Sequence, residues 1–332
     1  EREFRNNVIH NNTTTYGRGG GILMFGNATI ENCEIYTNTA GDAGGGIHCC
    51  ISDPIIHNCK IYDNTSYGEE HGGGGISIFH CHPTIVSSEI SSNYANKGAG
   101  IFINDDTCFT GHIGRTIIDQ CTISNNNAEY QCGGIYVYTV SFEEYSLIKC
   151  KNSIVYNNNA NTTAGNEILI ETYTGQIDES SITYCCIEPN GLFIEGNQNL
   201  LVSENNIFIN PLFSDEEYHL SQSSPCIDRG DPDSDEDGEY WITDEDDQDP
   251  DGSRFDLGCY YYSHEGDMIV FTEGVHWISF PILSQDGICS NALVPPINNQ
   301  LYQDAYYLNN DGGLLQDVFG DPTILSFQLI EG

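Results

Sequence analysis

One pattern recurs through the first two thirds of the chain: an apolar residue followed three positions later by asparagine. The intervals between successive apolar members are 27, 26, 29, 33, 31 and 33 residues, which are too variable for a helical repeat. Seven coils joined by loops of different length accommodate such intervals. The seven pairs are Val8 and Asn11, Ile35 and Asn38, Ile61 and Asn64, Ile90 and Asn93, Ile123 and Asn126, Ile154 and Asn157, and Ile187 and Asn190.

Two further sets of residues recur in step with these pairs. The first set consists of small or amide-bearing residues two places before each apolar residue, as a stack of inward-facing side chains requires. The second set consists of glycine runs, each followed directly by a short segment that contains a β-branched residue. Clusters of glycine and asparagine at short intervals exclude a continuous helical stripe. The first set is Asn6, Cys33, Cys59, Ser88, Cys121, Asn152 and Cys185, and the glycine segments are 19–22, 44–47, 72–76, 98–101 and 133–135.

These short periodic segments predict an all-β fold, a parallel β-solenoid over residues 1–210. Each strand pairs with its counterpart in the next coil, so like residues stack along the axis. We expect each recurring asparagine to adopt the left-handed turn conformation and also to hydrogen-bond the amides above and below it.

The segments 44–47 and 32–38, which read GGGI and NCEIYTN, resemble the right-handed parallel β-helix repeat proteins. This pectate-lyase-like superfamily includes secreted bacterial surface proteins, and the resemblance covers residues 1–262. It implies a right-handed parallel β-helix (β-solenoid) closed by a C-terminal cap. Because the family contains carbohydrate-active enzymes, adhesins and passive stalks, the resemblance is specific for the fold and not for the function.

Two further regions follow the repeat. Residues 211–262 resemble the closing segment of such proteins, so we interpret them as a cap over the last open edge of the solenoid. Residues 263–332 lack the glycine and asparagine pattern and contain β-rich segments such as 276–283. We predict that they form a small β-rich domain that continues beyond Gly332.

The predicted cap contains acidic residues with the spacing of a calcium loop. Acidic side chains occur at loop positions 1, 3, 5 and 12, with Gly238 at position 6. A second match begins at Asp247 but has Gly258 at its twelfth position, for which Asp256 is a substitute. We therefore predict calcium as the cofactor, against the alternative of a solvated acidic loop. The predicted ligands are Asp233, Asp235, Asp237, Glu239 and Asp244 in the first loop, and Asp247, Asp249, Asp251 and Asp256 in the second.

The long interval between Ile90 and Ile123 contains the candidate catalytic group. The resemblance implies outward polar side chains on successive coils, whereas this group shares one loop. A loop rich in Asn and Asp is the ordinary alternative. The group consists of Asn104, Asp105, Asp106, His112 and Arg115.

Histidines gather in the second and third repeats. They suit either a metal patch or ordinary surface and ladder positions. They are His48, His57, His71, His80 and His82.

The chain contains 14 cysteines, several of them at one repeat position. Cys33 and Cys59 occupy that position on adjacent coils, as Cys121 and Cys185 do across one intervening coil, so we predict stacked free thiols. Disulfides are expected instead near corners and loops, and a clamp around the acidic segment is an alternative. The candidates for disulfides near corners and loops are Cys49, Cys50, Cys81, Cys108 and Cys132. The candidate pair for the clamp is Cys226 with Cys259.

The chain has 49 acidic and 10 basic residues and a formal net charge of −39. Such a surface repels nucleic acid and favours divalent counterions, and we expect no membrane span because no long apolar stretch occurs. We expect an extracellular or cell-surface structural or adhesive protein, a non-catalytic stalk, adhesin or filament subunit stabilised by calcium. Its predicted partner is a cell-surface or extracellular polymer, or further copies of itself end to end. The alternative is a carbohydrate-active enzyme or carbohydrate-binding module that acts on polysaccharide along the β-helix face.

Overall fold

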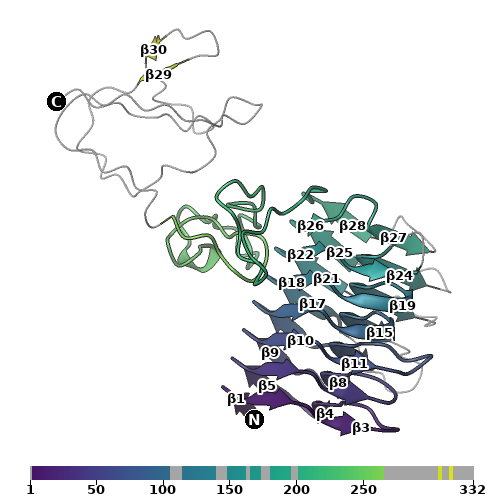
Figure 1. The fold of residues 1–332 in the computed structure, drawn as a ribbon. Coiled ribbons are helices and arrows are strands. Elements are labelled where there is room, and N and C mark those ends of the chain that lie inside the picture. The colour runs from purple at the N-terminus through teal and green to yellow at the C-terminus, as the bar shows by residue number, and fades with distance from the viewer. Residues whose placement is uncertain are drawn as a thin grey trace. The chain divides into compact units, whose positions relative to one another are not determined.

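The computed structural model describes residues 2–104, 114–139, 148–161, 165–172, 180–195, 201–264, 306–308 and 314–316 (Figure 1). The chain divides into two units: one comprises Glu1–Asp247 and Arg254–Tyr262, the other Gln248–Ser253 and Ser263–Gly332. The first unit contains the all-β parallel solenoid that the repeat predicts. In the second unit, strands β29 (Tyr306–Leu308) and β30 (Leu314–Gln316) pair antiparallel. The described residues contain no helix that is long and apolar enough to cross a membrane.

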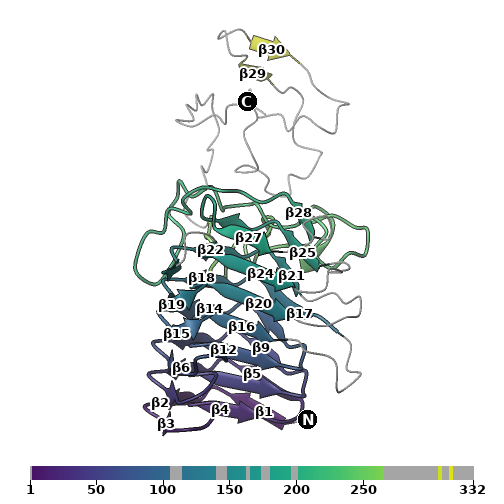
Figure 2. The same ribbon diagram turned by 90° about the vertical axis from the view of Figure 1, so that its right-hand side faces the viewer.

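Four parallel sheets stack coil upon coil along the solenoid, as Figures 1 and 2 show. Each strand pairs with its counterpart in the next coil, as predicted. Sheet A consists of β1 (Arg2–Arg5), β5 (Ala28–Glu31), β9 (Ile55–His57), β13 (Thr84–Val86), β17 (Thr116–Asp119), β21 (Ile148–Lys151), β25 (Ser180–Thr183) and β28 (Leu201–Glu204). Sheet B consists of β2 (Val8–His10), β6 (Glu34–Tyr36), β10 (Lys60–Tyr62), β14 (Glu89–Ser91), β18 (Thr122–Ser124), β22 (Ile154–Tyr156) and β26 (Cys186–Ile187).

The other two sheets complete each coil. Sheet C has short strands, and sheet D follows it after the glycine corner. Sheet C consists of β3 (Thr13–Thr14), β7 (Thr39–Ala40), β11 (Thr65–Ser66), β15 (Tyr94–Lys97), β19 (Asn127–Gln131) and β23 (Asn159–Ala160). Sheet D consists of β4 (Ile22–Met24), β8 (Ile47–Cys50), β12 (Ile76–Phe79), β16 (Ile101–Asn104), β20 (Ile135–Thr139), β24 (Ile168–Thr172) and β27 (Leu192–Glu195).

Sheet B carries the apolar column that the repeat predicts. Ile35 pairs in register with Ile61, and Ile61 with Ile90, and all three side chains are fully buried. Parallel pairing in register places each side chain over its equivalent, so one branched residue per coil fills the interior. The inward column is Ile9, Ile35, Ile61, Ile90, Ile123, Val155 and Ile187.

The predicted register is wrong by one residue in the first and sixth of these coils. Val8 and Ile154 face outward, and the inward positions belong to Ile9 and Val155. Both positions are apolar in these two coils, so hydrophobicity alone does not distinguish the faces. Ile154 is fully buried because apolar residues of the segment after the solenoid pack against it from outside. Val8, which has no such cover in the described chain, is 58% exposed.

Asparagines form a continuous ladder directly after sheet B, and all of its members except the exposed Asn12 are buried. Asn64 Nδ2 donates to Asn93 Oδ1 at 3.1 Å and to the Ile35 carbonyl oxygen at 2.8 Å. Asn64 Oδ1 accepts both the backbone and the side-chain N–H of Asn38 at 3.0 Å. Each buried amide therefore joins three coils inside the core. The ladder consists of Asn12, Asn38, Asn64, Asn93, Asn126 and Asn158.

The double role predicted for these asparagines is wrong, because the left-handed conformation belongs to the residue before each ladder member. These six residues have φ values between 53° and 63°. A left-handed residue bends the chain out of sheet B and leaves its own side chain outside, so the next side chain points inward. The bend residues are Asn11, Thr37, Asp63, Ser92, Asn125 and Asn157, two of which were predicted as ladder members.

Glu167 ends the ladder in the place that a further asparagine would take. Its Oε1 accepts the Asn158 backbone N–H at 3.0 Å, and its Oε2 accepts the Asn158 side-chain amide. Burial raises the pKa of Glu167 to about 9, and Glu188 acts in the same direction. Glu167 is therefore protonated at neutral pH. Asn190, which the repeat predicts as the last ladder residue, has φ 65° and makes none of the ladder bonds of the described chain.

A second row of inward-facing side chains lies where each coil passes from sheet A to sheet B. The Cys59 N–H donates to Ser88 Oγ at 3.1 Å, and the Cys121 N–H donates to Ser153 Oγ at 3.0 Å. The predicted members Asn6 and Asn152 are instead the left-handed residues that precede the row, with φ of 55° and 50°. The row consists of Asn7, Cys33, Cys59, Ser88, Cys121, Ser153, Cys185 and Asn206.

All 12 cysteines that the structure describes are free thiols, and 11 of these are buried. The predicted stacked thiols are confirmed. The Cys226 thiol hydrogen-bonds Cys186, and the Cys259 N–H donates to Thr122 Oγ1 at 3.1 Å, so packing holds these two cysteines against different strands. The predicted disulfides are therefore wrong for Cys49, Cys50, Cys81 and Cys132 and for the Cys226–Cys259 clamp, and Cys108 lies outside the described residues.

Glycine lets consecutive coils approach closely at the corner between sheets C and D. Gly44 has φ 66°, and a Cβ atom on Gly45 would lie 2.5 Å from the Gly74 carbonyl oxygen. That separation is far below van der Waals contact, so larger residues are excluded at this corner. The glycine runs thus have the role predicted for them.

Residues 211–247 and 254–262, which we call the flank segment, run beside sheets A and B (Figure 1). Tyr260 Oη donates to Glu89 Oε2 at 2.7 Å, and the Gly258 N–H donates to the Asn152 carbonyl oxygen at 2.8 Å. These contacts lie along the side of the solenoid, whereas the sequence predicts cover over its last coil. The outward row of sheet B begins with Val8, continues with the charged residues Glu34, Lys60 and Glu89, and ends with Thr122 and the apolar Ile154 and Cys186.

Asn64→Ala is expected to lower the free energy of unfolding by about 3 kcal/mol, because it leaves buried amide and carbonyl groups on two neighbouring coils unpaired. Chemical denaturation monitored by circular dichroism measures this change. Asn159→Ala is the matched control, since it removes an exposed bond of 3.1 Å to Asn127 Oδ1. Its effect is expected to stay below about 0.5 kcal/mol, and equal losses in the two variants would contradict the ladder's role.

Candidate metal centre

An acidic loop of the flank segment is fixed to sheet A at the end of β21. Lys149 Nζ pairs with the Glu236 carboxylate, and Lys151 Nζ donates to the Ser234 carbonyl oxygen. Asn152 Nδ2 donates to Ser234 Oγ at 3.1 Å. Lys151 is buried, so its bond to the loop is shielded from water. These contacts position the loop against the solenoid.

Carboxylates within the loop accept backbone N–H groups of the same loop. The Asp237 N–H donates to Asp235 Oδ1 at 3.1 Å, and the Gly238 N–H donates to Asp233 Oδ1 at 3.3 Å. Gly238 has φ 91°, which a residue with a side chain rarely adopts. The glycine predicted at loop position 6 therefore allows the chain to fold back on its own carboxylates.

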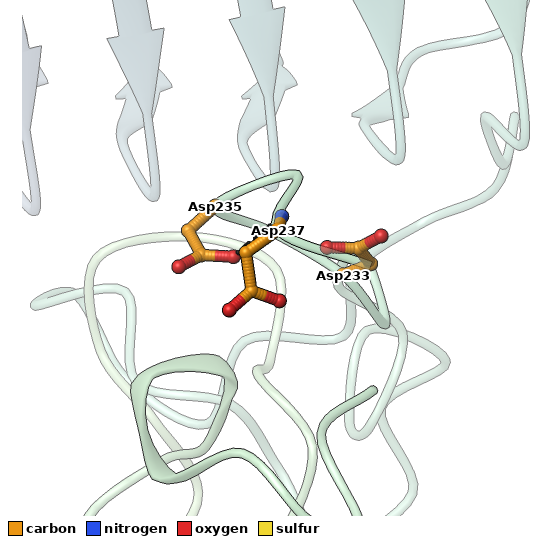
Figure 3. Close-up of side chains that lie close together, drawn as sticks. All are labelled: Asp233, Asp235 and Asp237. Atoms are coloured by element: carbon orange, nitrogen blue, oxygen red, sulfur yellow. Dashed lines mark hydrogen bonds between the residues drawn. The ribbon is translucent and has the colours of Figure 1, made fainter. Parts of the chain in front are cut away.

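The loop brings five aspartates into two groups that share Asp235. In each group, one carboxylate oxygen from every member lies within 4.8 Å of the others. Calcium binds oxygen ligands at about 2.3–2.6 Å, so opposite ligands of one ion lie up to about 5 Å apart. The first group, shown in Figure 3, is Asp233, Asp235 and Asp237, and the second is Asp235, Asp244 and Asp247.

Asp247 is the residue whose place in this centre the spacing did not predict. The sequence pattern makes it the first residue of a second loop, whereas its carboxylate joins Asp235 and Asp244. Asp247 is fully buried, its Oδ1 accepts the Ser234 N–H at 2.6 Å, and its Oδ2 has no hydrogen-bond partner in the described chain. Burial raises the pKa of Asp247, and the charges of Asp244 and Asp235 add to this effect. A cation would satisfy the unpaired oxygen and offset the repulsion.

The remaining predicted ligands lie outside these two groups. Asp251 accepts the Ser253 N–H at 3.1 Å and the His264 N–H at 2.9 Å, and Asp256 accepts the Asp228 N–H at 2.7 Å. Their carboxylates therefore hold backbone segments in place. Glu239 and Asp249 likewise belong to neither group within the described chain, so their role as ligands stays a prediction.

The candidate catalytic residues are only partly described. Asp105, Asp106 and His112 lie outside the described residues. Asn104 ends strand β16, and Arg115 precedes strand β17. Both are partly exposed, and the prediction for this group stays untested.

The histidines of the second and third repeats lie in separate surroundings. His71 Nδ1 is 3.2 Å from Asp42 Oδ1, and Arg18 Nε donates to Asp42 Oδ2 at 2.7 Å. His48 is buried beside them, and neither of its ring nitrogens has a hydrogen-bond partner in the described chain. Burial lowers the pKa of His48 to about 4, and the charge of Arg18 acts in the same direction. Among the described residues, the groups close enough to hold a metal consist of aspartates and not of these histidines.

A family model described as the right handed beta helix region matches residues 1–107. The match covers the strands from β1 to β16, and the same sheets continue beyond it. The match and the parallel sheets together identify the solenoid as a right-handed parallel β-helix. No curated protein and no solved structure matches the chain significantly.

His48 is expected to make the fold sensitive to mild acid. Its pKa in the folded chain is about 4, below the ordinary value of 6.5, so the unfolded chain binds the proton more readily. Its contribution to stability is therefore complete above pH 6.5 and is lost as the pH falls towards 4. The loss amounts to roughly 3 kcal/mol.

This prediction is checked with His48→Gln, which removes the titrating ring. Denaturation curves for both proteins between pH 4 and pH 7 should show a shallower pH dependence for the variant. His57→Gln, the same exchange at an exposed histidine, is the control variant. Parallel curves for the parent chain and His48→Gln would refute the assignment.

Proposed function

We propose that this chain is an extracellular or cell-surface structural or adhesive rod, non-catalytic and stabilised by calcium in its flank segment. The observation that carries the proposal is that outward-facing polar side chains of successive coils hydrogen-bond one another along the solenoid. Asn58 Nδ2 donates to Asn32 Oδ1 at 2.7 Å, and Asn159 Nδ2 donates to Asn127 Oδ1 at 3.1 Å. Side chains engaged in this way stiffen the rod and are less free to hold a substrate.

Aromatic side chains on the outer face of sheet B support a scaffold more than a sugar-binding platform. The ring of Tyr36 stacks on His10 at 5.0 Å and on Tyr62 at 4.9 Å, with interplanar angles of 5° and 9°. Sugars pack on the faces of aromatic rings, and these rings turn their faces towards one another. The column therefore favours the structural proposal over the carbohydrate-binding alternative.

The buried thiols are compatible with the proposed extracellular location. Burial raises the pKa of Cys59 to about 11 and that of Cys259 to about 12. The thiolate is the reactive form, so thiols with such high pKa values resist oxidation. A net charge of −39 also suits an environment rich in calcium.

Calcium is expected to stabilise the folded chain. Millimolar Ca²⁺ should raise the melting temperature and excess chelator should lower it, because a ligand that binds only the folded state shifts the unfolding equilibrium. At a calcium concentration 100 times the dissociation constant, the gain is about 2.7 kcal/mol. Scanning calorimetry with Mg²⁺ at equal ionic strength provides the control, and an unchanged melting temperature would remove calcium from the proposal.

The non-catalytic part of the proposal predicts no turnover of polysaccharides. Neutral and acidic polysaccharides incubated with the full chain should release neither reducing ends nor unsaturated products. Binding of the same polymers, followed by co-sedimentation, would be compatible with an adhesive role. Turnover that Asp105→Asn or His112→Gln abolishes would establish the enzymatic alternative instead.

A further inference from the structure

The acidic loop departs from the arrangement that its spacing predicts. In a loop for a single ion, the carboxylates at positions 1, 3, 5 and 12 surround one point. In this chain, Asp244 at position 12 gathers with Asp247 and Asp235, and not with Asp233 and Asp237. Asp235 alone belongs to both groups.

The second group contains the observation that points to a bound cation of its own. Asp247 is fully buried and leaves Oδ2 without a hydrogen-bond partner among the described residues. Asp244 precedes and Asp247 ends a single 3₁₀ turn, Glu245–Asp247, and the carboxylates of both gather with that of Asp235. An unpaired carboxylate oxygen in a buried site needs a proton or a cation.

The lysines that anchor the loop leave this charge uncompensated. Lys149 pairs with Glu236, and Lys151 bonds Ser234 and lies 3.6 Å from Asp119. The five clustered aspartates therefore keep a formal charge of −5. One divalent ion would leave −3 among carboxylates only a few ångströms apart, whereas two ions would leave −1.

We propose that the loop binds two calcium ions that share Asp235 as a bridging ligand. Asp233, Asp235 and Asp237 hold the first ion, and Asp235, Asp244 and Asp247 hold the second. Calcium takes six to eight oxygens, so backbone carbonyl groups and water complete each shell. This inference rests on the calcium-stabilised fold proposed above and specifies the number of ions and their ligands.

Calcium stoichiometry of the full chain tests the proposal directly. The chain is stripped with chelator and titrated with Ca²⁺ by isothermal calorimetry in about 150 mM salt, which screens weak surface binding. Native mass spectrometry counts the ions that remain bound. We expect two saturable sites.

Single substitutions then assign each ion to its ligands. Asp237→Asn should remove only the first ion, Asp244→Asn only the second, and Asp235→Asn should weaken both at least tenfold. Asp247→Asn should also remove the second ion, and the partly exposed Asp244 gives the same answer if burial of Asp247 makes that variant unstable. Asp246→Asn is the matched control, because Asp246 is an exposed aspartate of the same loop outside both groups and should leave two ions.

Three results would overturn the two-ion centre. One is a single ion that Asp237→Asn and Asp244→Asn abolish alike, which leaves a calcium-stabilised fold with one ordinary loop. Another is two ions that persist after Asp235→Asn. The third is no saturable binding at all, which also removes calcium from the proposed function.

Discussion

The whole solenoid depends on keeping each coil in register with the next. Its strands have two to five residues, so none is stable alone and each relies on backbone hydrogen bonds from its neighbours. A slip by one residue would turn the inward isoleucines outward, but apolar pairs such as Ile154 and Val155 weaken that penalty. The asparagine ladder provides the stricter constraint. An amide displaced from Asn38, Asn64 or Asn93 would leave several buried donors and acceptors unpaired.

The residue types on the outer surface of the solenoid depend on how the flank segment packs against it. Where the flank segment packs on sheet B, the outward position holds Ile154 or Cys186, and both are buried with Leu220, Cys226 and Leu257. Earlier coils place Glu34 and Lys60 at the equivalent position, and Lys60 meets the flank segment through its charge, with Nζ 3.7 Å from Glu217 Oε2. The flank segment thus adds a second, lateral core to the first. It also brings the acidic loop to Lys149 and Lys151, two of the ten basic residues of the chain.

The loop illustrates how far spacing can predict a metal centre. Asp233, Asp235 and Asp237, which the spacing selected, do lie close together, because a short loop with glycine at its sixth position folds back on carboxylates nearby in sequence. Spacing placed Asp247 in a different loop. Its carboxylate joins Asp235 and Asp244 because it is buried where it accepts the Ser234 N–H at 2.6 Å, a contact between residues 13 positions apart in the chain. The same limit explains the disulfides: which thiol lies near Cys226 is decided by packing against β26, not by the distance along the chain.

The sequence by itself determined the class of fold, since glycine corners, small inward residues and asparagine every coil exclude helices and require stacking of equivalents. It also indicated that many of the thiols are buried and that a cluster of acidic residues lies in one loop, for which calcium binding is our proposal. The tertiary structure decided which of two adjacent apolar or amide residues faces inward, as at Ile154 and Val155 or Asn157 and Asn158. It also decided where the flank segment lies and which aspartates meet. These choices depend on contacts between residues far apart in the chain, and local spacing carries no information about such contacts.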